Sequence, residues 1–275
     1  MRWLTIVAGA AVLLALLPAT AFGQQRCLGE RVTVDATNGA DQIRATRGAD
    51  VIAGGDGPDR IFTGGGRDLI CAGGGADEIF SGPGDDRIDG GSGDDLIDAG
   101  DGADEARGGG GADRLIASPG DDESYGGPGT DLVDFEDSKG PVAVSLTLRF
   151  SSGPGGGDLL DDFESVIGSR DDDILAGDRG RNVLIGGSGN DILAGEGGAD
   201  ILAGFRGSDY IDGGIGRDRC SAEFRASCER GFPFPVPERP LPRAQLGGSA
   251  EGTSARPSSR LRAFALASPA KPPAR

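Results

Sequence analysis

Histidine is absent from this chain of 275 residues, and aromatic residues make up only 5% of it. Without histidine the chain contains neither the HExxH motif of zinc proteases nor a Ser–His–Asp triad. Its four cysteines are too scattered to form a zinc site with one another. No long apolar run follows residue 17, which argues against a pore-forming segment. We therefore expect a protein that is not an enzyme and that has no transmembrane segment in its mature form.

Glycine and proline are abundant instead, with 52 and 16 residues, and the net charge is −17. A composition of this kind is typical of a solvated, disordered chain that cannot bury a core. Only a regular order of residues along the chain can reverse that interpretation.

The first residues have the pattern of an export signal. A basic start is followed by an apolar run over residues 4–17, by Pro18 and by the small residues Ala19–Ala21. This pattern predicts a secretory signal peptide over residues 1–23 and a secreted, extracellular protein. The alternative is a membrane anchor, for which an apolar run of this length is short.

An even number of cysteines is consistent with an oxidising destination. Pairing by position joins Cys27 to Cys71 and Cys220 to Cys228, so that each bridge staples one end of the fold. Two other connectivities remain possible.

A nine-residue step runs through most of the chain, in copies such as GGSGDDLID at residues 90–98. The first array places its aspartates at Asp41, Asp50, Asp59, Asp68, Asp77, Asp86, Asp95, Asp104, Asp113, Asp122 and Asp131. The second array has Asp173, Asn182, Asp191, Asp200, Asp209 and Asp218. The two arrays are out of frame with each other, so a different kind of segment separates them. Aspartate and glycine also mark ordinary turns, but turn chemistry alone does not fix a constant step.

The repeat predicts an all-β solenoid. Its glycines permit backbone conformations that other residues avoid, and an aliphatic residue two positions after each aspartate points one side chain inward, as a short strand does. Two turns and two such strands make one coil of 18 residues. Stacked coils bury the aliphatic column between two thin parallel sheets.

The pattern GGxGxDxUx, in which U is a large aliphatic residue, resembles the nonapeptide of repeats-in-toxin (RTX) proteins, also called the hemolysin-type calcium-binding repeat. The resemblance covers about residues 36–221. It implies a right-handed parallel β-roll with two stacked arrays. It also implies that Ca²⁺ ions lie between neighbouring coils, held by aspartate carboxylates and backbone carbonyls.

The aspartates are expected to form two rows, because turns two steps apart stack on each other. Carboxylates about 4.8 Å apart repel by roughly 3 to 4 kcal/mol at an effective dielectric of 20, so a ladder of them requires a cation. Calcium fits because it is hard and takes six to eight oxygen ligands. The predicted ligands are Asp50, Asp59, Asp68, Asp77, Asp86, Asp95, Asp104, Asp113, Asp122, Asp131, Asp173, Asp191, Asp200, Asp209 and Asp218. Asn182 lacks the second oxygen and should weaken its site. Folding should then depend on calcium.

Four segments are expected after residue 23: a first array with an N-terminal cap over residues 24–133, a connector over 134–168, a second array with a C-terminal cap over 169–228, and a disordered basic tail over 229–275. Asp41 and Asp50 lack the first two glycines and suit the cap. Alternating apolar residues from Val142 to Phe150 predict a half-buried strand in the connector, and Val166 and Ile167 are expected to re-enter the core.

Two core positions near the end of the first array are filled poorly, by Ala106 and Ser124, so the packing there should be loose. The sequence as a whole predicts an exported calcium-binding β-roll with a structural or surface-adhesion role. The alternative is an accessory or remnant module of a secreted RTX enzyme or toxin. The acidic arrays disfavour nucleic acid as a partner, and the sequence identifies no protein or cell-surface partner.

Overall fold

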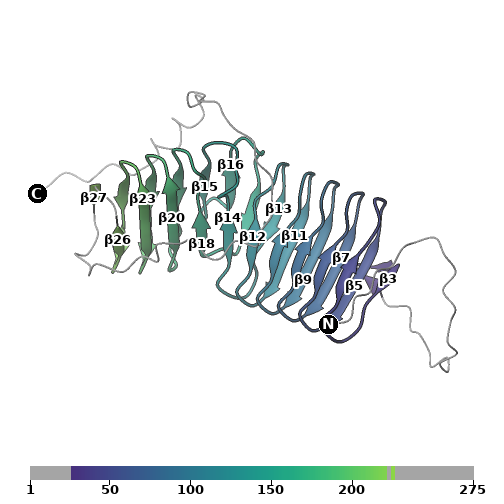
Figure 1. The fold of residues 1–275 in the computed structure, drawn as a ribbon. Coiled ribbons are helices and arrows are strands. Elements are labelled where there is room, and N and C mark those ends of the chain that lie inside the picture. Colours follow the sequence, from purple (N-terminus) through teal and green to yellow (C-terminus); the bar gives the residue numbers. More distant parts are fainter. Residues whose placement is uncertain (1–25, 222–223, 227–275) are drawn as a thin grey trace, which may run out of the picture. The chain divides into compact units, whose positions relative to one another are not determined.

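The computed structural model describes residues 26–221 and 224–226. In this part of the chain every regular element is a strand, and the strands form two long sheets that face each other (Figure 1). It contains no helix long and apolar enough to cross a membrane. The expected signal peptide over residues 1–23, the tail over 229–275 and Cys228 lie outside the described residues.

One sheet has ten strands. In spatial order they are β26 (Arg219–Ser221), β23 (Ile201–Arg206), β20 (Val183–Ser188), β18 (Ser165–Ile167), β14 (Leu132–Asp134), β12 (Arg114–Ile116), β10 (Leu96–Asp98), β8 (Glu78–Phe80), β6 (Arg60–Phe62) and β4 (Gln42–Arg44). All of their pairings are parallel.

The facing sheet has thirteen strands. In spatial order they are β27 (Phe224–Ala226), β24 (Tyr210–Asp212), β21 (Ile192–Ala194), β19 (Ile174–Ala176), β15 (Ala143–Ser145), β16 (Phe150–Ser152), β17 (Leu159–Asp161), β13 (Glu123–Tyr125), β11 (Glu105–Gly110), β9 (Arg87–Ser92), β7 (Leu69–Gly74), β5 (Val51–Asp56) and β3 (Val34–Asp35). Two minor pairs complete the fold: β1 (Arg26–Cys27) with β2 (Glu30–Arg31), and β22 (Gly197–Gly198) with β25 (Ile215–Gly216).

Within each array, strand partners are 18 residues apart, as in the pairing of Ile97 with Ile79 and Leu115. One coil therefore contains one strand of each sheet and two turns, and the predicted parallel β-solenoid is confirmed. Aliphatic side chains between the sheets are buried in two columns, one per sheet, because each three-residue strand points its middle residue inward. The column of the ten-stranded sheet consists of Ile43, Ile61, Ile79, Ile97, Leu115, Val133, Val166, Leu184 and Leu202.

The glycine turns allow the coils to stack closely. Gly91, for example, has a φ of +104°, and a Cβ atom there would collide with the carbonyl oxygen of Gly73 on the preceding coil. Only glycine combines this left-handed backbone with so close an approach. The repeated glycines therefore set the spacing between turns as well as their shape.

The connector interrupts only the thirteen-stranded sheet. After β14 the chain forms β15 next to β19, returns antiparallel through β16, and places β17 next to β13. In the facing sheet β14 pairs directly with β18, and β18 with β20. Across this region the thirteen-stranded sheet therefore has two more strands than the sheet opposite.

Two details of the connector differ from the sequence prediction. The expected single strand from Val142 to Phe150 is wrong, because the chain turns over residues 146–149 and leaves Leu148 64% exposed. The inward alternation is right as far as Leu146, which is buried. Val166 lies in the core as expected, but Ile167 follows it in the strand and points to the outer face, where it is half-buried.

The Cys27–Cys71 disulfide confirms that part of the predicted pairing. Cys71 follows the core residue Ile70 in β7, so it lies on the outer face of its sheet. The bridge holds the β1–β2 hairpin against β5 and β7. The hairpin is thus fastened to the third strand from the sheet edge, and its attachment covers the outside of the sheet instead of the open end of the core.

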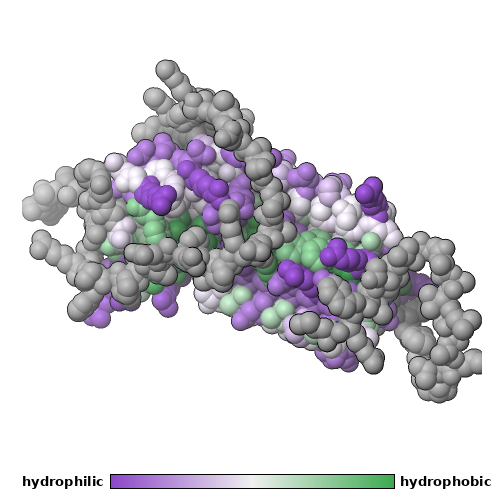
Figure 2. All heavy atoms as spheres, in the orientation of Figure 1, coloured by the Kyte–Doolittle hydropathy of each residue, from purple (hydrophilic) through white to green (hydrophobic). Residues whose placement is uncertain are grey.

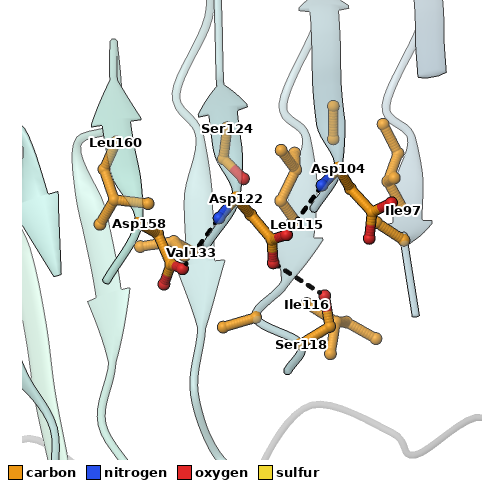
Figure 3. A pocket seen from close by; sticks show the side chains of 13 residues that line it. Ile97, Asp104, Leu115, Ile116, Ser118, Asp122, Ser124, Val133, Asp158 and Leu160 are labelled. Carbon is orange, nitrogen blue, oxygen red and sulfur yellow. Dashed lines mark hydrogen bonds between the residues drawn. The ribbon is translucent and has the colours of Figure 1, made fainter. Parts of the chain in front are cut away.

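A cavity lies where the core residues are small. It is lined by Ala106, Ser124 and Leu160 in one sheet and by Leu115 and Val133 in the other, and Figure 3 shows Ser124 between Leu160 and Leu115. This is the loosely packed end of the first array that the sequence predicts.

Candidate calcium-binding turns

Each ladder aspartate lies at the end of a turn, directly before a strand. The backbone N–H of Asp77 donates to carboxylate Oδ1 of Asp95 across 2.8 Å, and Asp59 donates to Asp77 in the same way across 2.7 Å. These bonds link each turn to the turn 18 residues further on. The aspartates of the first array therefore form two rows, one beside each sheet.

The row beside the ten-stranded sheet contains Asp41, Asp59, Asp77, Asp95, Asp113 and Asp131. The other row contains Asp50, Asp68, Asp86, Asp104 and Asp122. In the second array Asp200 and Asp218 follow Asn182 in one row, and Asp191 and Asp209 follow Asp173 in the other. All fifteen predicted ligands are buried.

The second carboxylate oxygen, Oδ2, usually has no partner. It is buried without a hydrogen bond in eleven of these residues: Asp59, Asp68, Asp77, Asp86, Asp95, Asp104, Asp113, Asp131, Asp191, Asp200 and Asp218. An unpaired buried carboxylate oxygen is costly in a folded protein. So many unpaired oxygens in regular rows indicate that a non-protein ligand binds beside them.

Burial changes the acidity of these groups. It raises the pKa of Asp95 and Asp104 from the ordinary 3.8 to about 7, and that of Asp59 to about 6. The backbone N–H donated to each carboxylate lowers its pKa, and neighbouring aspartates raise it. Without a cation, the fold therefore disfavours the ionised form that each carboxylate needs as a metal ligand.

Oxygen atoms converge beside the first glycine of the repeat. The position of a Cβ atom on Gly90 would be 2.5 Å from Asp95 Oδ2 and 2.5 Å from the carbonyl oxygen of Gly108 on the next coil. Calcium–oxygen distances in proteins are about 2.3 to 2.6 Å. A side chain at Gly90 would fill the space between these two oxygens. Because glycine has none, the space has room for a calcium ion.

The same arrangement recurs in the second array. A Cβ atom on Gly195 would be 2.5 Å from Asp200 Oδ2 and 2.5 Å from the carbonyl oxygen of Gly213. Among the described residues, no three Asp, Glu, Cys or His side chains gather as a metal-binding group. The oxygens beside each of these glycines come from a carboxylate and a backbone carbonyl, a mixed set that calcium accepts and zinc does not.

Sequence analysis missed two carboxylates that extend the rows into the connector. Asp158 Oδ1 accepts the N–H of Asp122 at 3.3 Å, and Glu164 Oε2 accepts the N–H of Asp131 at 2.8 Å. Each precedes a buried aliphatic residue by two positions, as in the repeat. That signal was present, but the nine-residue step is broken there, so a search for the step does not find it.

The geometry agrees with the outcome of comparison with known proteins. The family model for the RTX calcium-binding nonapeptide repeat (four copies) matches residues 35–70, 72–106, 98–133, 167–202 and 185–220, which together make up more than half of the chain. The chain belongs to this RTX family. No curated protein matches it.

The RTX repeats make this a calcium-binding β-roll. A bound calcium ion would supply the positive charge that the unpaired Oδ2 atoms lack. The protein residues fix the arrangement: Asp Oδ1 joins consecutive coils, glycine leaves the space open, and the aliphatic residue two positions later anchors the turn to the core.

Proposed function

We propose that this RTX protein is exported and non-enzymatic, and that it serves as a structural or surface-adhesion module that becomes rigid where calcium is plentiful. The observation that carries the proposal is the set of eleven buried, unpaired Oδ2 atoms in two rows. Their desolvation opposes folding until cations neutralise them. Extracellular modules commonly bind calcium at about 10⁻⁴ to 10⁻³ M, so such a fold would form outside a cell.

The outer surface of the first array supports a structural role. Its strands present charged side chains that pair along the stack, such as Arg60 with Glu78 and Arg87 with Glu105, both at 2.7 Å. Figure 2 shows mainly hydrophilic side chains on this face of the molecule, with hydrophobic ones between them. A charged surface over coils that are hydrogen-bonded to one another suits a structural module.

The experiment is a titration of the oxidised protein with Ca²⁺, followed by far-UV circular dichroism, with Mg²⁺ as the control ion. We expect a cooperative gain of sheet signal with calcium and little change with magnesium, because the coordination of magnesium is smaller and stricter. A spectrum that is the same in excess chelator and in millimolar calcium would overturn the proposal.

A further inference from the structure

Most turns in the described part of the chain are of two kinds, which differ in the residue four positions before the ladder carboxylate. In all eleven turns with an unpaired Oδ2, that residue has a positive φ. Ten of these residues are glycines, such as Gly91 before Asp95 with a φ of +104°, and the eleventh is Glu196 before Asp200 with a φ of +66°. We call these open turns.

Other turns supply their own hydrogen-bond donors. The N–H and Oγ1 of Thr46 both donate to Asp50 Oδ2, at 2.9 and 2.8 Å. At Asp173 the N–H of Ser169 donates to Oδ2 at 2.6 Å, while Ser169 Oγ donates to Oδ1 at 2.8 Å. Neither Thr46 nor Ser169 has a positive φ. We call such turns self-capped.

Further self-capped turns complete this group. Thr37 donates to Asp41 Oδ2 through its N–H and its hydroxyl, and Ser118 Oγ donates to Asp122 Oδ2 at 3.3 Å. In the connector the donor lies further away in sequence: Ser151 Oγ, seven positions before Asp158, donates to its Oδ2 at 2.5 Å. The N–H of Asp178 donates to Asn182 Oδ1 at 2.8 Å. Asp209, which follows Phe205, belongs to neither group.

We propose that the residue four positions before each carboxylate decides whether a turn takes calcium, so that the self-capped turns bind none and the connector folds without the ion. In a self-capped turn a donor hydrogen lies in front of Oδ2, where a cation would bind, and its positive partial charge repels one. The oxygen is already satisfied, so its burial does not require a metal. This inference rests on the proposed calcium binding, and it removes Asp50, Asp122 and Asp173 from the predicted ligands.

The two kinds of turn are segregated along the chain. Seven consecutive open turns run from Asp59 to Asp113. Around the connector, the turns at Asp122, Asp158, Asp173 and Asn182 are self-capped, and Asp131 is the exception. Open turns resume at Asp191. The same segment has the largest core side chains.

The connector also buries large hydrophobic side chains, which we expect to keep it folded without calcium. Phe135 and Phe163 are 4% and 5% exposed, and Val144 and Val166 are fully buried between strands of both sheets. Burial of large apolar side chains stabilises a fold without any metal. The open turns instead combine aliphatic core residues with rows of desolvated carboxylates. We therefore expect that segment to fold only when calcium binds.

Hydrogen exchange of the full, oxidised chain, read by mass spectrometry in excess chelator and then in millimolar Ca²⁺, tests the inference. In chelator we expect backbone protection to persist over residues 132–185 and to be lost over 54–113, and we expect calcium to restore the second segment. If both segments lose protection in chelator and regain it together with calcium, the inference fails while the proposed function stands. If calcium changes protection nowhere, the proposed function fails as well.

A substitution tests the selecting residue directly. Replacing the capping serine with glycine (Ser169→Gly) removes the hydroxyl and permits the positive φ of the open turns, in which the N–H of this residue donates to a carbonyl of the next coil instead of to Oδ2. The turn at Asp173 should then open, and native mass spectrometry at saturating calcium should count one more bound ion than in the wild type. The matched control is Ser165→Gly, which makes the same change at an outward strand position in β18 and should leave the count unchanged. An unchanged count for Ser169→Gly, or a gain for both variants, would contradict the proposal.

Discussion

Asp94 and Asp95 are neighbours in sequence, but their carboxylates face different surroundings. Asp95 is buried with Oδ2 unpaired, whereas Asp94 is exposed and its Oδ1 accepts the N–H of Ala112 from the next coil at 2.8 Å. The two residues have the same side chain and belong to the same turn. They therefore allow the role of a calcium ligand to be separated from the effect of net charge.

We expect Asp95→Asn to shift the calcium midpoint of folding to at least several-fold higher concentration, because it removes an anionic oxygen from beside the space at Gly90. Asp94→Asn makes the same charge change and should move the midpoint by much less. Calcium titrations followed by circular dichroism give both midpoints. Equal shifts for the two variants would mean that general charge repulsion, and not ligation, sets the calcium requirement.

Gly90→Ala should remove the space beside Asp95 and the Gly108 carbonyl, so calcium should bind to fewer sites and more weakly. Gly110→Ala is the control, since a Cβ there meets nothing within 4 Å and its φ is not left-handed. The two variants can be compared by isothermal titration calorimetry. A wild-type calcium stoichiometry in Gly90→Ala would show that the ion does not use this space.

Folding and calcium affinity should depend on pH in opposite directions. Burial raises the pKa of Asp95 and Asp104 from 3.8 to about 7 in the absence of metal. Between pH 4 and 7 the metal-free fold therefore holds protons that the unfolded chain has released, so lowering the pH through 7 stabilises that fold. Protons and calcium compete for the same oxygens, so the calcium midpoint should rise as the pH falls from 7.5 to 5.5.

The measurement is a set of calcium titrations at several pH values, together with far-UV circular dichroism of the calcium-free protein as the pH is lowered from 7.5 to 5. A midpoint that is independent of pH, or a calcium-free protein that loses sheet signal on acidification towards pH 5, would contradict the assignment of these carboxylates.

Ala106→Val should fill part of the cavity at the end of the first array. Ala106 is 3% exposed and lies between Ile88 and Ser124 on the neighbouring strands. We expect the free energy of unfolding in calcium to rise by about 1 kcal/mol, as cavity-filling substitutions commonly achieve. Ala103→Val, at an exposed turn position, is the control. Thermal unfolding of both variants tests this prediction. A lower melting temperature for Ala106→Val would mean that the cavity cannot accept the added methyl groups.

The nine-residue step was sufficient to predict the coil, the two rows and the core columns, because each depends on a local spacing that every copy repeats. Ile97 and Asp95, for example, have the same relation to their turn as Ile79 and Asp77. The path of the connector could not be predicted in this way. The position of β15 next to β19 depends on pairing between residues 31 apart in the sequence, such as Ala143 and Ile174, and no periodicity indicates that pairing.

The division into open and self-capped turns was also hidden in the sequence. Thr46 and Ser169 were visible where other repeats have glycine, but their effect depends on the sign of φ and on the direction of an N–H bond. Sequence spacing alone treated Asp50 and Asp173 as equivalent to Asp95. The structure distinguishes Asp50 and Asp173 from Asp95 by the donor hydrogen that lies in front of their Oδ2 atoms.

The two additional strands of the connector also affect how the two sheets match. Strands are about 4.8 Å apart, so the thirteen-stranded sheet is longer than the sheet opposite by roughly 10 Å over this region. The longer sheet has to take up this difference locally, at the connector. The mismatch is encoded in covalent connectivity, so calcium bound at the turns on either side cannot remove it.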